Sequence, residues 1–280
     1  MPEIIDGLTS PTLRHLREQW WDDEFSEFVV ETLRPRPGNR ILNVGCGEGL
    51  AEVNIGRLHI SQVRLVGVDL RPHKVLEARQ KAASHNQRVG YAAGDARRLP
   101  FRSGCFDSVY CVAVVQHIDD VAATVAEFAR VTAPKGRVLA VEPDSTTRYL
   151  YSSVPSGRTA FEASNRFFSL LNSARGGDPG STIGSLLPAY FSRAGIEPVS
   201  VRLFPVANTF LGPIPDTVWT TRRQAVTRAM SASGEPALLE AGQRYLEALE
   251  RYERDCASAG ESVVEIQNTL LFATVGQRQS

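Results

Sequence analysis

The fold of this chain is decided by residues 40–50, which read RILNVGCGEGL. Ile41, Leu42 and Val44 form a short apolar run, which is typical of a strand buried on both faces of a parallel sheet. Three glycines at alternate positions follow, and residues 51–58 then predict a helix. Glycine adopts positive φ and lacks a Cβ, so the backbone there can turn sharply and lie against a ligand. Strand, glycine-rich turn and helix together predict the opening unit of a nucleotide-type α/β fold.

The spacing of the glycines separates two ligand classes. A dinucleotide site uses the pattern Gly-x-Gly-x-x-Gly, whose third glycine would fall on position 50 if the pattern started at Gly45. That position holds Leu50, and the chain instead reads Gly-x-Gly-x-Gly. This spacing disfavours a nicotinamide-dependent oxidoreductase.

Two further predicted strands are followed by acids. Residues 63–68 form a second apolar run that ends at Asp69, 24 positions after Gly45. A carboxylate at the end of the second strand can accept hydrogen bonds from both hydroxyls of a ribose. A third run, residues 89–93, leads into Gly94 and Asp95, which places a second acid at a strand end.

These residues resemble the ordered motifs of class I S-adenosylmethionine-dependent methyltransferases, most closely the small-molecule branch that includes the ubiquinone/menaquinone methyltransferases. The matching segments are NVGCGEG at 43–49, VDL at 68–70, GDA at 94–96, FDSV at 106–109 and APKGR at 133–137. The resemblance is close over residues 38–142 and weaker over residues 184–276. It implies an α/β fold with a Rossmann-like sheet of seven strands, mostly parallel with the last strand antiparallel. Helices on both faces, a helical insertion or lid, and the cofactor S-adenosyl-L-methionine are implied as well.

In the resembled family, the glycine-rich loop and the strand ends bind the cofactor. The positions that carry this role over to the present chain are Asn43, Gly45, Cys46, Gly47, Gly49, Asp69, Leu70, Gly94, Asp95, Ala96, Cys111 and Val112.

The resemblance also implies a role for several of these residues. Asp69 would hold the ribose, Leu70 would pack on the adenine face, and Asp95 and the Ala96 backbone would contact the adenine edge. An alternative for Asp95 is a helix-capping or turn acid. The family usually has Asp or Glu where this chain has Asn43, and that acid helps to hold the ammonium group of the cofactor. Because Asn brings no charge, we expect a weaker affinity for the cofactor.

Composition bounds the remaining classes of function. The 280 residues are 42% hydrophobic and 22% charged, and 31 Lys and Arg balance 31 Asp and Glu. This balance argues against a broad electrostatic footprint for nucleic acid, although a local basic patch stays open. The four cysteines show no metal-ligand spacing with the histidines, so no metal site is expected. With no signal peptide and no apolar run near the ~20 residues of a membrane helix, we expect a cytoplasmic protein without a membrane partner.

The chain is expected to form a single methyltransferase domain over residues 1–280. The parts of this domain are an N-terminal helical lid at 10–34, a cofactor-binding core at 38–145, substrate-side helical insertions at 146–195 and 208–262, and final strands at 196–206 and 267–276. Within the core, residues 134–136 predict a turn before a strand at 137–141. The alternative to the lid is an ordinary helix with one core and one surface tryptophan, Trp20 and Trp21.

Two residues are candidates for catalysis. The strand at 106–112 is expected to end beside the reactive part of the cofactor, because ligands of open α/β sheets bind at the carboxyl ends of the strands. His117 follows this strand and could act as a general base, since its unperturbed pKa lies near neutrality. Glu142, at the end of the next strand, could also act as a base. The alternatives are a first-turn histidine satisfied by a neighbouring acid and a glutamate that caps a segment.

The sequence predicts methyl transfer from S-adenosylmethionine to a small organic acceptor, by in-line displacement in a partly apolar pocket. The aromatic residues Tyr149, Tyr151, Phe210 and Trp219 would line this pocket, and ordinary core packing is the alternative. No Asn-Pro-Pro-Tyr or Asp-Pro-Pro-Tyr follows the fourth strand, which disfavours nucleic-acid and protein amide methyltransferases. An RNA or protein methyltransferase and a non-catalytic cofactor-binding partner subunit remain alternatives. A homodimer is compatible with the sequence, which fixes neither the oligomeric state nor the acceptor atom.

Overall fold

The computed structural model describes residues 18–57, 62–144, 149–174 and 183–280. These residues divide into two compact units. We call residues 18–144, 183–204 and 270–280 the sheet unit, and residues 149–174 and 205–269 the helical unit. Two long strands contribute residues to both units.

The sheet confirms the predicted α/β class. The strands of its main path run in the order β3-β2-β1-β4-β5-β8-β6, and β7 pairs with β8. Neighbours from β3 to β5 are parallel, whereas β8 is antiparallel to β5. The bounds are β1 Arg40–Val44, β2 Arg64–Asp69, β3 Val89–Ala93, β4 Phe106–Val112, β5 Thr132–Asp144, β6 Leu150–Ser152, β7 Ile196–Leu211 and β8 Val264–Arg278.

The described residues form eight strands, one more than the seven expected. The additional strand is the three-residue β6, which pairs with the first part of β8. The predicted turn at residues 134–136 is wrong as a strand boundary, because β5 already begins at Thr132. The backbone is nevertheless irregular at these residues. Lys135 has a φ of +64°, and the pairing of β4 with β5 shifts register between Phe106 and Ser108.

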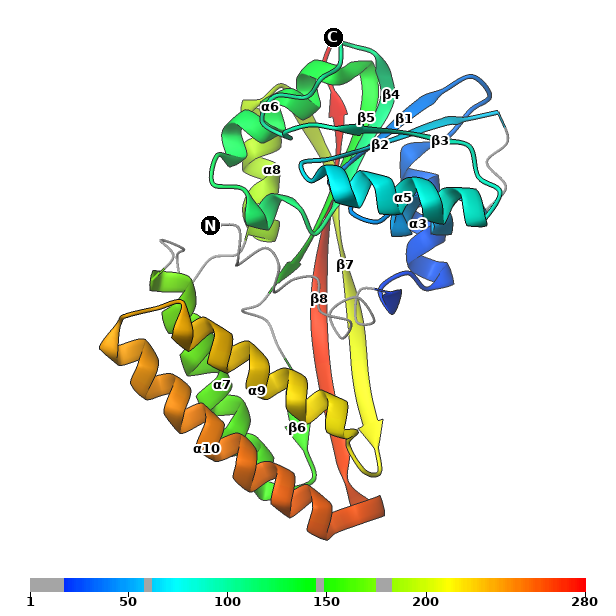
Figure 1. The fold of residues 1–280 in the computed structure, drawn as a ribbon. Coiled ribbons are helices and arrows are strands. Elements are labelled where there is room, and N and C mark those ends of the chain that lie inside the picture. Colours follow the sequence, from blue (N-terminus) through cyan, green and yellow to red (C-terminus); the bar gives the residue numbers. More distant parts are fainter. Residues whose placement is uncertain (1–17, 58–61, 145–148, 175–182) are drawn as a thin grey trace. The chain divides into compact units, whose positions relative to one another are not determined.

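Helices cover both faces of the sheet (Figure 1). The bounds in the sheet unit are α3 Asp23–Leu33, α4 Leu50–Arg57, α5 Pro72–Ser84, α6 Val121–Val131 and α8 Ile183–Arg193. On β4, the Ser108 hydroxyl donates to the Leu33 carbonyl of α3 (2.8 Å), while Val109 belongs to a core cluster with Phe128 of α6. Because consecutive side chains of a strand point to opposite faces, α3 and α6 lie on opposite sides of the sheet.

Helix α3 occupies most of the described part of the predicted lid. It begins where the Asp22 side chain accepts the Phe25 N–H (2.8 Å), which is a standard N-cap arrangement. Its apolar face is buried, and Phe25 and Phe28 pack on Phe204 of β7. Residues 23–33 therefore belong to the core of the sheet unit. The first part of the predicted lid, residues 10–17, lies outside the described residues.

The helical unit has a core of its own. Its helices are α7 Pro155–Ala174, α9 Asp216–Ser231 and α10 Pro236–Ala259, and α10 packs on both α7 and α9. Trp219 of α9 and Tyr252 of α10 are buried and meet edge to face, with ring centroids 5.2 Å apart. Among the residues that the structure describes, no helix has the length and apolar character needed to cross a membrane.

Candidate functional site

The glycine-rich loop links β1 to α4 and bends back toward the end of β2. The N–H of Gly45 donates to the Val68 carbonyl (2.7 Å), and the N–H of Gly47 donates to Asp69 Oδ2 (2.9 Å). Gly45, Gly47 and Gly49 all have positive φ, at +73°, +53° and +81°. This left-handed backbone is the conformation that glycine adopts without steric cost.

The loop is packed on one side and open at its centre. A Cβ added to Gly45 would come within 2.4 Å of Val114, so this glycine permits a close approach of the chain after β4. A Cβ on Gly47 would meet no atom within 4 Å. The backbone at Gly47 therefore faces open space, as a loop that receives a ligand must.

Asp69 lies beside this opening, at the end of β2. It is 6% exposed, and its Oδ1 accepts the Arg71 N–H (3.0 Å) while Oδ2 accepts the Gly47 N–H. Oδ1 also accepts the Arg71 Nε–H (3.4 Å), whereas Oδ2 keeps a second lone pair that can accept a ribose hydroxyl. The next residue, Leu70, is 60% exposed, which is unusual for a leucine and leaves an apolar surface for an aromatic ring. These observations fit the nucleoside part of the predicted cofactor.

The end of β3 meets the same edge of the sheet. The Gly94 N–H donates to the Asp69 carbonyl (3.0 Å), and Ala96 is half-buried. Asp95 accepts both the backbone N–H (2.9 Å) and the guanidinium (2.7 Å) of Arg97. These hydrogen bonds hold the pKa of Asp95 below its usual value. Asp95 thus makes the turn interaction that was the alternative to adenine binding, and the two are compatible because a carboxylate accepts several hydrogen bonds.

The end of β4 forms another wall of the loop. Cys111 is fully buried, and burial raises the pKa of its thiol, so it behaves as a small apolar side chain. Val112 is half-buried. Ala113 has a φ of +55°, a conformation that costs a non-glycine residue free energy and is concentrated at functional sites. Sequence reasoning missed this strained residue, which delivers Val114 onto Gly45.

The predicted catalytic residues are both associated with one short helical turn, η2 Val115–His117: Glu142 binds its backbone and His117 is its last residue. Glu142 is fully buried; its Oε1 accepts the N–H groups of Val114 (2.9 Å) and Val115 (2.8 Å), and its Oε2 accepts that of Gln116 (3.3 Å). The carboxylate therefore fixes the backbone of the turn after β4. His117 ends this turn and is exposed.

Glu52, in the first turn of α4, was not predicted. It is fully buried, and its Oε1 accepts the side-chain N–H of Asn43 (2.9 Å). Its Oε2 meets no hydrogen-bond donor among the described residues. Burial raises the pKa of Glu52 to about 7. The one signal in the sequence was an acid flanked by Ala51 and Val53, which a first-turn helix position explains equally well.

Two tyrosines complete a buried polar group around Glu52. We call Asn43, Glu52, Tyr91 and Tyr110 the polar cluster. The Oη atoms of Tyr91 and Tyr110 are buried and have no hydrogen-bond partner within the described parts of the chain. A Cβ on Gly67 of β2 would lie 2.7 Å from the Tyr91 ring and 2.8 Å from Glu52 Oε1, so a glycine is needed beneath the cluster.

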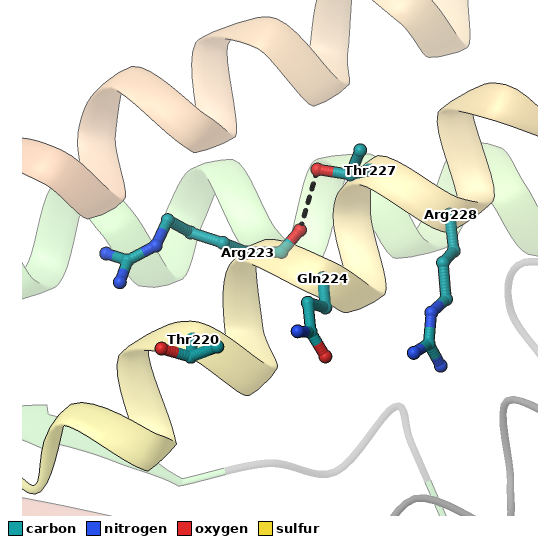
Figure 2. A pocket seen from close by; sticks show the side chains of 5 residues that line it. All are labelled: Thr220, Arg223, Gln224, Thr227 and Arg228. Atoms are coloured by element: carbon teal, nitrogen blue, oxygen red, sulfur yellow. Dashed lines mark hydrogen bonds between the residues drawn. The ribbon is translucent and has the colours of Figure 1, made fainter.

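A separate pocket of about 230 Å³ lies in the helical unit. Figure 2 shows that the residues lining it come from successive turns of one helix, α9. These residues are Thr220, Arg223, Gln224, Thr227 and Arg228. Arg223 is ion-paired with Glu253, and Thr227 Oγ1 donates to the Arg223 carbonyl (3.0 Å). None of the predicted site residues lines this pocket.

Comparison with known proteins agrees with this geometry. Residues 42–140 match the family described as "Methyltransferase domain". The 27-O-demethylrifamycin SV methyltransferase of Amycolatopsis mediterranei is 29% identical over 148 residues, which cover 49% of this chain and 53% of that protein. The ubiquinone biosynthesis O-methyltransferase of Xanthomonas oryzae pv. oryzae is 28% identical over 135 residues, covering 44% and 55%. The chain thus spans about half the length of these curated relatives.

Solved structures share the fold. A candidate methyltransferase of Bacillus halodurans superimposes with a TM-score of 0.58 at 18% identity, covering 92% of this chain and all of that one. The [4+2]-cyclase SpnF superimposes with a TM-score of 0.51 at 17% identity, covering 92% and 81%. At such identities the likeness establishes the fold alone. Residues 42–140 thus match a methyltransferase domain, and the ordered motifs and the fold around it resemble those of the class I S-adenosylmethionine-dependent methyltransferases, a family whose cofactor is S-adenosylmethionine.

Proposed function

We propose that this protein transfers a methyl group from S-adenosylmethionine to a hydroxyl group of a small organic molecule. The relatives matched over its predicted cofactor-binding core are named 27-O-demethylrifamycin SV methyltransferase and ubiquinone biosynthesis O-methyltransferase, and both names specify an oxygen acceptor. The observation that carries the proposal is the open backbone of Gly47 beside the Asp69 carboxylate.

When bound, S-adenosylmethionine supplies a methyl group that its sulfonium already activates. The task left to the protein is to orient the acceptor and exclude water, and orientation can contribute ~7–11 kcal/mol of barrier lowering. The loop at Gly45–Gly49 and the carboxylate of Asp69 would fix the cofactor. The turn after β4, held by Glu142, would form the wall on the acceptor side.

His117 and Glu142 then have different proposed roles. Glu142 is a positioning residue, because its carboxylate holds three backbone N–H groups. His117 is exposed at the end of the same turn, where its imidazole could accept the proton of an acceptor hydroxyl. His117→Ala should lower kcat at pH 7 and leave the Kd of the cofactor unchanged. Equal kcat values for the variant and the wild type would remove His117 from the mechanism.

Cofactor binding is tested by isothermal titration with S-adenosylmethionine and its demethylated product. Asp69→Ala should abolish binding of both, and Asp69→Asn, which keeps one acceptor oxygen, should weaken it. Asp107→Asn is the matched control, because Asp107 accepts the Arg40 N–H (2.8 Å) where these strands begin, at the edge opposite Asp69. Binding that is unchanged in Asp69→Ala would overturn the site assignment.

Turnover is tested with a panel of small hydroxyl-bearing molecules, with mass spectrometry to detect methylated products. Methylation of at least one acceptor supports the proposal. Salt-sensitive retention of RNA during purification would favour an RNA methyltransferase instead. Cofactor binding without turnover across a broad panel would favour a non-catalytic partner subunit.

The insertions at 146–195 and 208–262 are predicted to lie on the substrate side. The helical unit contains much of both insertions and is proposed to select the acceptor. Tyr149 and Tyr151 are exposed and available for contact, whereas Trp219 is a core residue of this unit. Tyr151→Ala should raise the KM for the acceptor without changing the Kd of the cofactor. A cytoplasmic location is proposed from the four cysteines, all of which are free thiols.

A further inference from the structure

The polar cluster beneath the glycine-rich loop contains an acid that the proposed mechanism does not use. Glu52 of α4 accepts the Asn43 Nδ2–H through Oε1, at 2.9 Å. This bond fixes the orientation of the Asn43 amide, because only its nitrogen can donate. Asn43 Oδ1 makes no hydrogen bond to the described residues and is left as an acceptor at the end of β1, directly before the loop.

The surroundings of Glu52 leave its charge without compensation. Its Oε2 lacks a donor in the described residues, although the side chain is fully buried. The titratable groups that act on it come from the loop and from β2, β3 and β4: Cys46, Asp69, Tyr91 and Tyr110. Burial raises the pKa of Glu52 to about 7; the Asn43 hydrogen bond lowers it, and the nearby Asp69 carboxylate raises it. The carboxyl group is thus poised between its two protonation states at neutral pH.

A cationic ligand at the loop would change this balance. S-adenosylmethionine carries a sulfonium and an ammonium group, and a positive charge near a buried carboxyl group favours its ionised form. The attraction is strong because the surroundings of Glu52 have a low dielectric constant. By linkage, a ligand that favours the ionised form binds more tightly when that form is already populated.

We propose that Glu52 is a proton-linked positioning residue of the cofactor site: binding of the cationic cofactor expels the proton of Glu52 into solvent, and the resulting carboxylate holds Asn43 with Oδ1 toward the ligand. The inference rests on the proposed function only in placing S-adenosylmethionine at the loop. Asn43 carries no charge, and Glu52, which is hydrogen-bonded to Asn43, thereby supplies the negative charge of the site.

The test is isothermal titration of the full chain with S-adenosylmethionine from pH 6 to pH 8.5, in buffers that differ in ionisation enthalpy. Wild-type affinity should rise about tenfold between pH 6 and pH 8, with release of roughly half a proton per cofactor at pH 7. Glu52→Gln, which keeps an acceptor for Asn43 but cannot ionise, should bind with a nearly constant Kd and release no proton from this site.

Two further variants keep the inference falsifiable if Glu52→Gln fails to fold. Asn43→Asp places a second carboxylate against Glu52, so the rise in affinity should move to higher pH. Glu127→Gln is the matched control, because Glu127 pairs with Arg130 of α6, outside the polar cluster, and the wild-type pH dependence should persist.

The outcomes separate the two proposals. Cofactor binding that is independent of pH in the wild type, or a pH dependence that persists in Glu52→Gln, overturns the role of Glu52 and leaves the methyltransferase proposal intact. Absence of cofactor binding at every pH instead refutes the proposed function itself.

Discussion

Both units bury glutamates completely, and Glu265 of the helical unit differs from Glu52 of the sheet unit in its partners. Glu265 of the helical unit is ion-paired with Arg222, accepts from Tyr252 Oη (2.8 Å) and accepts from Gln267 Nε2 (2.6 Å). Glu52 of the sheet unit accepts one hydrogen bond from Asn43, and its second oxygen finds no donor in the described residues.

We interpret this difference as that between a structural network and a proposed ligand site. Around Glu265, the protein itself satisfies both carboxylate oxygens, so the network ties β8 to α9 and α10. Around Glu52, one acceptor oxygen and two tyrosine hydroxyls find no partner among the described residues, at a cost in stability that a ligand can offset. Burial of an acid does not by itself indicate a functional site. A buried carboxylate oxygen without a donor is the more informative observation.

The largest effect on stability is expected when Arg222, the cation paired with Glu265, is removed. Arg222→Ala leaves Glu265 buried without its counter-ion, which should lower the free energy of unfolding by about 3–5 kcal/mol in urea denaturation. Arg158→Ala is the control, because its pair with Glu162 is exposed and should be worth at most about 1 kcal/mol. Similar losses in the two variants would mean that the Glu265 network is no more than a surface pair.

The next effect concerns the ionisation of Glu52 in the absence of cofactor. Its folded-state pKa of about 7 lies above the ordinary value of 4.5, so its contribution to stability is full below pH 4.5 and lost as the pH rises through 7. Glu52→Gln should therefore raise the free energy of unfolding at pH 8 by roughly 3 kcal/mol, and by much less at pH 5. Thermal unfolding at both pH values checks this, and a variant destabilised at pH 8 would contradict it.

A smaller effect compares two glycines of the same loop. Gly47→Ala should cost roughly 1–2 kcal/mol of stability from its positive φ, and its methyl group should weaken cofactor binding by filling the open space. Gly45→Ala has the same backbone cost plus a clash with Val114 at 2.4 Å, so it should lose more stability. Measured Kd and unfolding free energy for both variants should rank them in this way; the reverse ranking would place the opening elsewhere.

The smallest effect compares two buried tyrosines. Tyr252 Oη lies 2.8 Å from both Glu265 Oε2 and Ser152 Oγ, so Tyr252→Phe should cost about 1–2 kcal/mol. Tyr110 Oη has no partner in the described part of the chain, so Tyr110→Phe should be neutral within about 1 kcal/mol or slightly stabilising. A large loss for Tyr110→Phe would show that its hydroxyl is satisfied, for example by ordered water.

Much of the secondary structure of the sheet unit could be predicted from local sequence patterns. The strands at 89–93 and 106–112 have the predicted bounds. Buried strands and amphipathic helices carry their periodicity in consecutive residues, so they are visible without the fold. The turn predicted at 134–136 failed because β5 absorbs it as an irregularity, which depends on pairing with β4.

The two long strands and the helical unit were less predictable from sequence. The final strands extend well beyond the predicted ranges, to Ile196–Leu211 and Val264–Arg278, because β7 and β8 pair with each other and satisfy residues whose own pattern is weak. Helix α9 was not distinguished within the insertion. Its mixed polar face, with Arg223 and Arg228, gives little periodicity, and its burial depends on Trp219 packing against α10.

The sequence by itself determined where the first strands lie along the chain, the glycine-rich turn and the acids at the strand ends. Periodicity and turn chemistry act over a few residues, so these features are visible locally. Only the tertiary structure decided which of these groups meet. Glu52 reaches Asn43 across nine positions, and Glu142 reaches the N–H of Val115 across 27. Such contacts depend on burial and on the pairing of strands, which no single stretch of the chain encodes.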